Sequence, residues 1–298
     1  MKSKFNIHFL YVLVAATLWG GAGIFVKAAG QYGIKEMQIV FFRAMFSAAI
    51  LGFIILLRDK RKFRLALRDI WLFAAAGVFS IVLFNFSYYK TMALTSLSVA
   101  AVLLYTAPIF VSILSVLLFR EKITLNKITS LVIAFVGCCF VTGLFTQGQR
   151  ITLTALIFGL LTGFGYSLYT IFSQILINKG YATLTITFYT FLFAAIGALP
   201  VVNVTKTVTQ VTAAPMGILV MVLMAIFNTV IPYLFYTSGL LGVPTSVAPI
   251  IATLEPVVAT VISVAIFNEA LTVCHFCGIV LVLLSILVLN LRGQVREN

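Results

Sequence analysis

The sequence predicts an all-α membrane protein with ten transmembrane helices, arranged as two inverted five-helix repeats. Three observations support this prediction: the composition, the spacing of the apolar segments, and a similarity between the two halves of the chain. Apolar residues make up 62% of the 298 residues and charged residues only 9%, whereas soluble domains contain about 25% charged residues. A water-soluble chain of this length could not bury so much apolar surface.

Apolar stretches of about 20 residues recur along the chain, and this is the length that a helix needs to cross roughly 30 Å of hydrocarbon. The first stretch runs from Phe9 to about Val26 without a clear cleavage site, which favours a transmembrane helix over a signal peptide. The ten predicted spans are residues 8–27, 36–57, 70–89, 97–119, 127–145, 152–177, 183–201, 214–237, 245–267 and 273–291.

The basic residues are distributed unevenly between the two sides that these spans define. One side receives Lys2, Lys4, Arg58, Lys60, Arg61, Lys62, Arg64, Arg68, Arg120, Lys122, Lys127, Lys179, Arg292 and Arg296. The other side receives Lys35, Lys90, Arg150 and Lys206, with Lys27 at the boundary. Because Lys and Arg accumulate in cytoplasmic loops, a multi-pass protein of the cell membrane with both termini in the cytoplasm is predicted. The same placement explains the net charge of +13 without a nucleic-acid partner.

The two halves of the chain resemble each other. Ser98–Thr124 aligns with Ser246–Thr272, 148 residues later, with nine identities over 27 positions. The matches Pro108/Pro256, Glu121/Glu269 and Thr124/Thr272 carry the most weight, because these residue types are scarce here. The predicted repeat units are residues 1–145 and 146–298. Since five is an odd number of spans, the second unit would enter the membrane with the opposite orientation.

Inverted repeats of this kind are typical of secondary transporters, in which the substrate binds near the midplane and the repeats rock about it. Motifs in both halves also resemble a known family. They are Leu18-Trp19-Gly20, Phe42-Arg43, Ala107-Pro108, Phe119-Arg120-Glu121, Leu254-Glu255-Pro256 and Phe267-Asn268-Glu269. This pattern is similar to the EamA family of the drug/metabolite transporter superfamily. The resemblance implies a ten-helix transporter, often an exporter of amino acids or other metabolites.

Glu255 is the first candidate for substrate binding, because it lies near the middle of the ninth predicted span. An ionisable group at that depth costs at least about 2.5–3.5 kcal/mol and is a functional candidate by default. Pro256 follows it and frees the carbonyl of Ala252 from its helical hydrogen bond. A carboxylate beside such a kink could bind a cation, a proton or a substrate ammonium group, or could simply pair with a buried donor.

Arg43 lies about seven residues into the second predicted span. Three interpretations stay open: it pairs with Glu255, it binds a substrate carboxylate, or its side chain snorkels to the interface.

Aromatic and amide side chains within the spans are further candidates for the transport pathway. Amide groups are costly in hydrocarbon unless they are paired, whereas tyrosines are also common at membrane interfaces. The predicted substrate-binding residues, besides Glu255 and Arg43, are Trp19, Asn85, Tyr88, Tyr105, Tyr166, Tyr169, Asn228 and Tyr233. Tyr236 belongs to the same aromatic group.

Pro108 and Pro256 are predicted to be paired kinks or hinges. Gly20, Gly159 and Gly163 are interpreted as sites of close helix packing. Glu121 and Glu269 are interpreted mainly as structural residues at helix ends, with gating or capping as the alternative.

The predicted function is a secondary transporter that moves a small metabolite, an amino acid or related compound, across the cytoplasmic membrane, and the family resemblance implies export. The alternative is efflux of lipophilic or cationic compounds. An intramembrane enzyme is less well supported, since the chain has no HExxH motif, and a scaffold would have no evident use for an inverted repeat. The absence of a GxxxxGK[ST] phosphate-binding loop indicates that the transporter has no ATPase of its own. The expected partners are a small solute and the lipid bilayer, with a proton or ion as a candidate coupling partner. No cofactor, metal site or nucleic acid is expected.

Overall fold

The computed structural model describes residues 6–144, 151–203, 207 and 214–291. Every regular element in these residues is helical. Six basic residues of the charge count, Lys2, Lys4, Arg150, Lys206, Arg292 and Arg296, lie outside the described residues.

Eight helical segments of the described chain are long and apolar enough to cross a membrane. They are Ile7–Gln31, Glu36–Arg58, Leu67–Leu94, Leu97–Phe119, Leu153–Asn178, Thr183–Val201, Pro215–Gly239 and Ala248–Phe267. Two more apolar helices, Leu125–Val141 and Val273–Leu289, are shorter. Each of the ten predicted spans therefore coincides with an apolar helix, within a few residues at either end. Helical structure and eight spanning-length segments are confirmed, whereas membrane crossing by the two shorter helices stays a prediction.

Three of the long segments each contain one unbroken α-helix, and the shorter α8 is also unbroken. They are α3 (Glu36–Arg58), α9 (Leu153–Asn178) and α10 (Thr183–Ala198), with α8 at Leu125–Val141. The last helix, α16, spans Val273–Leu291.

The other five long segments are interrupted. The segment Ile7–Gln31 consists of α1 (Ile7–Gly20) and α2 (Ala22–Gln31). Leu97–Phe119 consists of α6 (Leu97–Leu104) and α7 (Ala107–Phe119), and Ala248–Phe267 of α14 (Ala248–Ala252) and α15 (Leu254–Phe267). In Leu67–Leu94, a π-helical turn at Val78–Leu83 joins α4 (Ile70–Gly77) to α5 (Phe84–Leu94). In Pro215–Gly239, a π-helical turn at Ala225–Val230 joins α12 (Pro215–Met224) to α13 (Ile231–Gly239).

The breaks before the two prolines have a common cause. A proline cannot donate to the carbonyl four residues earlier, so Leu104 and Ala252 lose helical partners and α6 and α14 end there. The hydroxyl groups of Thr106 and Thr253 then donate to the carbonyls of Leu103 and Ile250, each over 2.6 Å. The predicted kinks thus occur in equivalent places, while hinge motion at Pro108 and Pro256 stays a prediction.

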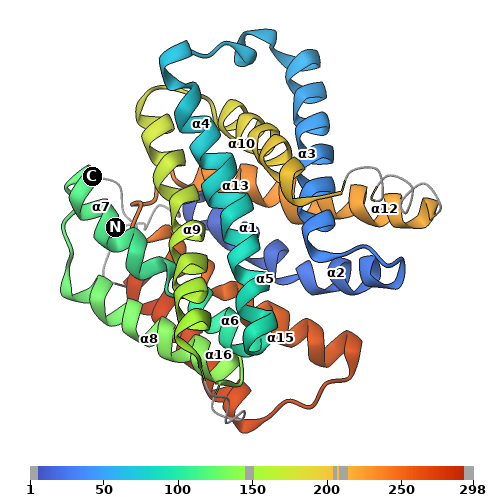
Figure 1. Cartoon of the computed structure of the whole chain (residues 1–298). Coiled ribbons are helices and arrows are strands. Elements are labelled where there is room, and N and C mark those ends of the chain that lie inside the picture. The colour runs from blue at the N-terminus through green and yellow to red at the C-terminus, as the bar shows by residue number, and fades with distance from the viewer. Residues whose placement is uncertain (1–5, 145–150, 204–206, 208–213, 292–298) are drawn as a thin grey trace.

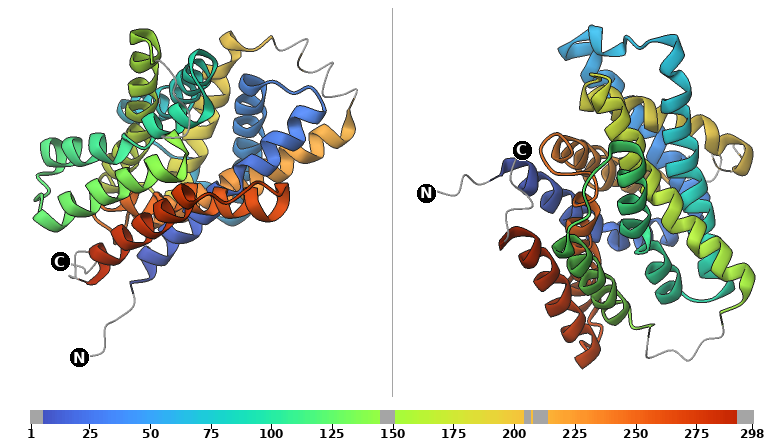
Figure 2. Two further views of the ribbon diagram at one scale, coloured as in Figure 1. Left: turned by 90° about the horizontal axis from the view of Figure 1, so that it is seen from below. Right: turned by 90° about the vertical axis from the view of Figure 1, so that its left-hand side faces the viewer.

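The two halves of the chain pack against each other rather than as separate bodies (Figures 1 and 2). Helix α3 contacts α10 and α12, α1 contacts α13 and α15, and α9 contacts α5, α6 and α7. Helix α16 lies along α8. The core is therefore formed mainly by contacts between helices of different halves.

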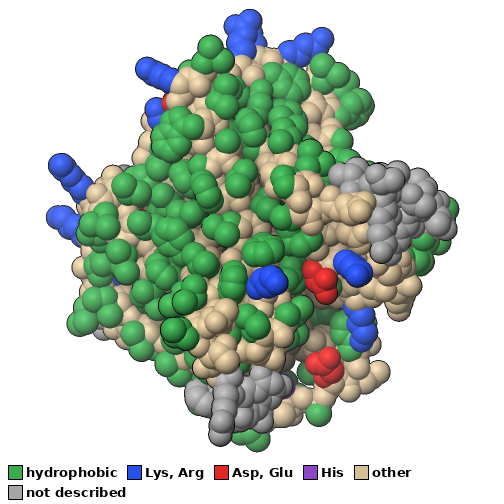
Figure 3. All heavy atoms as spheres, viewed as in Figure 1, with side chains coloured by type: hydrophobic (Ala, Val, Ile, Leu, Met, Phe, Trp, Pro, Cys, Tyr) green, Lys and Arg blue, Asp and Glu red, His purple; other side chains and the backbone are tan. Residues whose placement is uncertain are grey.

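Large apolar side chains cover much of the outer surface, as Figure 3 shows for one face. Phe53, Trp71 and Leu117 are each more than 60% exposed. In Figure 3 basic side chains lie at the top and left edges of this apolar face, and others lie beside acidic side chains in its lower part. Such an apolar surface with charged edges is what a bilayer-embedded helical protein presents.

Gly163 of α9 allows the close approach that the sequence predicted. A Cβ atom there would overlap Thr106 Oγ1 and lie 2.7 Å from the Leu103 carbonyl oxygen. Gly159 meets the Leu103 side chain in the same way, and Gly20 meets Val258 and the Glu255 carbonyl.

We expect Gly163→Ala to destabilise the protein by about 1–3 kcal/mol, because the added methyl group has no space in a packed helix contact. The measurement is the thermal unfolding midpoint of the purified protein in detergent. The control is Gly30→Ala, where the methyl group meets no atom within 4 Å and alanine favours the helix. Equal midpoints for the two variants would contradict the packing role.

Candidate functional site

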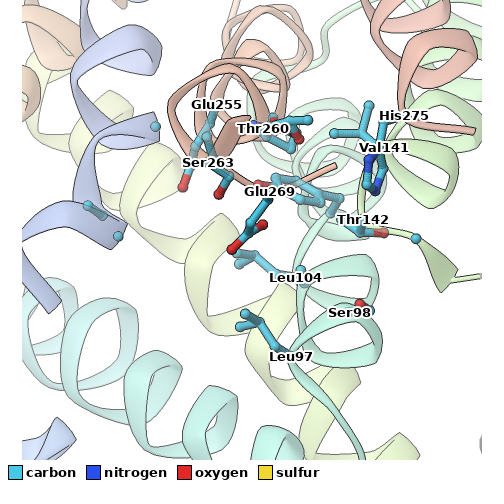
Figure 4. A pocket seen from close by; sticks show the side chains of 18 of the residues that line it. Leu97, Ser98, Leu104, Val141, Thr142, Glu255, Thr260, Ser263, Glu269 and His275 are labelled. Carbon is cyan, nitrogen blue, oxygen red and sulfur yellow. Dashed lines mark hydrogen bonds between the residues drawn. The ribbon is translucent and has the colours of Figure 1, made fainter. Parts of the chain in front are cut away.

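A cavity with two connected lobes lies between the halves. The lobes measure about 510 and 500 Å³, within the range of small-molecule sites. Trp19, Gly23, Tyr88, Leu104 and Glu255 line both lobes, so the two are continuous. The lining also includes exposed residues at the start of α6 and beyond the end of α15, so the cavity opens at that end (Figure 4).

The predicted substrate-binding residues are brought together at this cavity. Nine of the ten line one or both lobes: Glu255, Arg43, Trp19, Asn85, Tyr88, Tyr105, Tyr166, Asn228 and Tyr233. The tenth, Tyr169, lines only a small space of about 10 Å³ next to them. Pro256 also lines the cavity. The residues come from both halves of the chain, which is why no single segment of sequence marks the site.

Glu255 projects into the cavity from the first turn of α15, directly after the break at Thr253. The Tyr166 hydroxyl interacts with its carboxyl group, and Arg43 acts on it electrostatically. Glu255 as a residue is half-buried, and it lines both lobes of the cavity. It is therefore available to a solute that enters the cavity.

Arg43 faces the 500 Å³ lobe from α3. Its Nε is buried and has no hydrogen-bond partner within the described residues, and the ion pairs found there do not include Arg43. Of the three interpretations of Arg43, the ion pair with Glu255 is not formed among the described residues. Binding of a substrate carboxylate and snorkelling to the interface stay predictions. A guanidinium donor and a carboxylate acceptor face one cavity without satisfying each other.

A cluster of aromatic rings forms the floor of the cavity. Trp19 packs against Tyr233 and Tyr236 with ring centroids 5.1 and 5.2 Å apart, and Tyr169 packs edge-on against Tyr233 at 4.8 Å. The hydroxyl groups beneath are paired, Tyr169 with Thr237 at 2.7 Å and Tyr236 with Thr170 at 2.8 Å. Tyr169, predicted to touch substrate, instead belongs to this packed layer.

The two predicted amide residues have different roles. Asn228, in the π-helical turn before α13, donates over 2.9 Å to the Leu18 carbonyl near the end of α1. Asn85 donates over 2.7 Å to the Ile81 carbonyl within its own segment. In both cases the amide stabilises an irregular stretch of helix that borders the cavity.

At the opposite end, beyond the aromatic floor, a polar network links the two halves of the chain. Glu121 accepts from the Thr245 amide at 2.7 Å and from the Ser246 hydroxyl at 2.5 Å. Lys127 donates to Glu121 at 3.3 Å, to Ser246 at 2.9 Å and to the Lys122 carbonyl at 3.2 Å. The network links the turn between α7 and α8 to the residues just before α14.

The network also determines the charge state of Glu121. Burial alone would raise the pKa of Glu121, but the hydrogen bond from Ser246, the Lys127 ammonium group and Thr245 together hold the pKa below its usual value. A lowered pKa means that the network stabilises this arrangement at neutral pH. That contribution is lost only as the pH falls through the lowered pKa.

Several cavity residues were not predicted as binding residues. Lys27, Glu36, Tyr89, Ser263, Glu269 and His275 line the lobes. Lys27 sits over the Phe267 ring, 3.8 Å from its centroid. These residues lie at the ends of their segments, where sequence position alone suggests an interface. The sequence signal that could have found Glu269 and His275 is their equivalence to Glu121 and Lys127 after the 148-residue shift.

We expect Asn228→Leu to lower the free energy of unfolding by about 1–3 kcal/mol, because the Leu18 carbonyl would lose its partner in a buried site. Thermal unfolding in detergent measures the change. Asn178→Ala is the control, since Asn178 is exposed and, among the described residues, its side chain accepts from Gln174 at 2.9 Å. An Asn228→Leu protein as stable as this control would show that the amide is not needed.

The comparisons with known proteins agree with this geometry. The chain is 26% identical over 283 residues to a protein of Archaeoglobus fulgidus named an uncharacterized transporter, covering 93% of this chain and 94% of the relative. It is 24% identical to the Salmonella typhimurium protein named uncharacterized inner membrane transporter YicL, with 97% of both chains covered. A solved crystal structure superposes with a TM-score of 0.81 at 16% identity, over 99% of this chain and all of the other. At that identity the match supports the fold alone.

The model of the EamA-like transporter family matches the chain twice, at residues 6–143 and 153–291. Together the two matches cover most of the sequence and repeat the division into halves that form the cavity walls. The family and the transporter-named relatives point to transport of small molecules rather than to catalysis. The chain belongs to the EamA-like transporter family.

Proposed function

We propose that the chain is a secondary transporter that exports a small zwitterionic metabolite, an amino acid or related compound, across the cytoplasmic membrane by alternating access. One observation supports the substrate class above all: Glu255 and Arg43 line the same cavity without forming an ion pair. An amino acid carries the complementary groups, an ammonium for Glu255 and a carboxylate for Arg43.

The energetics of buried charge support this assignment. Ionisable side chains at membrane depth are costly and normally pair with each other or face a wet cavity. Arg43 and Glu255 have opposite charge, and pairing them directly would satisfy both. A zwitterion between them would provide the same compensation only while it is bound, so the unpaired arrangement favours binding of such a solute.

Alternating access would use the two halves as inverted repeats that rock about the cavity. The charge count places the end closed by Glu121 in the cytoplasm, so the cavity would open to the outside. A proton or cation at Glu255 is a natural coupling partner, since it would neutralise the carboxylate after the solute has left.

The aromatic walls favour efflux of lipophilic cations as a second candidate. Trp19, Tyr88, Tyr166 and Tyr233 surround the carboxylate, and aromatic faces attract cations. In this case Arg43 would oppose binding instead of contributing to it. The effect of removing Arg43 therefore separates the two candidates.

We expect purified protein in liposomes to exchange one or more amino acids, and Glu255→Gln to reduce that exchange at least tenfold, because the variant cannot ion-pair with an ammonium group. Arg43→Gln should have a similar effect. The measurement is radiolabel counterflow across a panel of amino acids, tetraphenylphosphonium and sugar phosphates, with and without a pH gradient. Asp59→Asn is the control, since it neutralises an acid that caps the Arg61 amide outside the cavity.

Binding can be measured in the same proteins by fluorescence. The chain has two tryptophans, and Trp71 is 62% exposed on the apolar surface. In a Trp71→Phe background, Trp19 alone reports occupation of the cavity. Normal amino-acid exchange by Glu255→Gln would contradict the site, and exchange of tetraphenylphosphonium that improves in Arg43→Gln would favour the second candidate.

A further inference from the structure

Two turns in the chain, 148 residues apart, have the same backbone geometry. Arg120 and Asn268 both adopt left-handed conformations, with φ of 56° and 55°. The amides of Glu121 and Glu269 both donate over 3.3 Å to the carbonyls of Ser115 and Ser263. The residues after these turns correspond as well.

The helices that follow the two turns begin in the same way. Thr124 caps α8 by accepting from the Lys127 amide at 3.4 Å, and Thr272 caps α16 by accepting from the His275 amide at 3.2 Å. Lys127 and His275 are therefore equivalent, as are Glu121 and Glu269. By the same shift, Thr245 and Ser246 correspond to Leu97 and Ser98.

The two sets of equivalent residues differ in their contacts. At the closed end, Glu121 accepts from Thr245, Ser246 and Lys127. At the open end, the side chains of Glu269, Leu97, Ser98 and His275 lie around the mouth of the cavity (Figure 4). Glu269 is exposed there, and it is absent from the ion pairs of the described residues.

The start of α6 has free donors for a carboxylate. Leu97 and Ser98 are its first residues, and the first amides of a helix have no partner within the helix. Among the described residues, the Ser96 side chain caps the Val99 amide, over 3.3 Å, and not the amides of Leu97 and Ser98. A carboxylate at this place would also be favoured by the helix dipole.

We infer that Glu269, Ser98 and His275 form the gate that closes the open end of the cavity during transport. In the closed form, the Glu269 carboxylate accepts hydrogen bonds from the Leu97 and Ser98 amides and from the Ser98 hydroxyl. His275 takes the place that Lys127 has at the other end. The inference rests on the proposed alternating-access function and assigns residues to its second closed state.

If the gate closes in this way, residues 98 and 269 come together during transport, although their side chains are separated in the structure (Figure 4). We test this with Ser98→Cys and Glu269→Cys in one full-length chain whose four native cysteines are replaced by alanine, using a short bis-methanethiosulfonate in liposomes. The matched control is Glu121→Cys with Ser246→Cys, since that pair is already in contact. We expect both pairs to cross-link, and the 98–269 link to stop the slower exchange that remains in this variant until a reductant is added.

A second arm keeps the native cysteines and separates gating from binding. We expect Glu269→Gln and Ser98→Ala to slow exchange about tenfold or more, because charge-assisted hydrogen bonds of the closed form are lost. Amino-acid binding followed through Trp19 should stay unchanged. Failure of every tested solute to bind would count against the proposed substrate class, while cross-linking would still decide the gate.

Two results would overturn the gate. One is efficient cross-linking of the 121–246 pair without any cross-linking of the 98–269 pair in protein that still exchanges solute. The other, which also decides the matter if the cysteine-free chain does not fold, is parental exchange rates in both Glu269→Gln and Ser98→Ala.

Discussion

Backbone hydrogen bonding in an apolar environment is the constraint on which this structure depends. A peptide group in hydrocarbon has no water to bond, so a membrane-spanning chain is helical except where it is buried in protein or lines a wet cavity. The irregular stretches of this chain follow that rule. The break at Gly21 and the breaks before Pro108 and Pro256 border the cavity, and the π-helical turns lie beside Asn85 and Asn228.

Polar side chains compensate each of these irregularities. Thr106 and Thr253 bond the Leu103 and Ile250 carbonyls beside the breaks, and Asn228 bonds the Leu18 carbonyl near the end of α1. The cavity and the broken helices therefore depend on each other. A broken helix needs polar partners for its free backbone groups, and the break at Thr253 in turn places Glu255 beside the cavity.

The two halves share a backbone plan but differ in chemistry. The turn geometries at Arg120 and Asn268 agree closely, yet the residue before the proline is Ala107 in one half and Glu255 in the other. The proposed substrate charge site thus belongs to one half, with Arg43 contributed by the other. At the two ends, Lys127 and His275 hold equivalent positions, so the two ends differ in the side chain that accompanies the glutamate.

The sequence by itself determined the all-helical fold, the positions of the spans and the family, because hydrophobic length and scarce residues such as Pro108, Pro256, Glu121 and Glu269 are local signals. It also identified Glu255 and most of the cavity residues, since polar groups are expensive inside apolar spans. Only the tertiary structure decided that Arg43 stands apart from Glu255, that Tyr169 packs in the floor, and that Glu121 is in an ion pair whereas Glu269 is in none within the described residues. Those distinctions depend on contacts between helices far apart in the chain, and periodicity and composition carry no information about such distances.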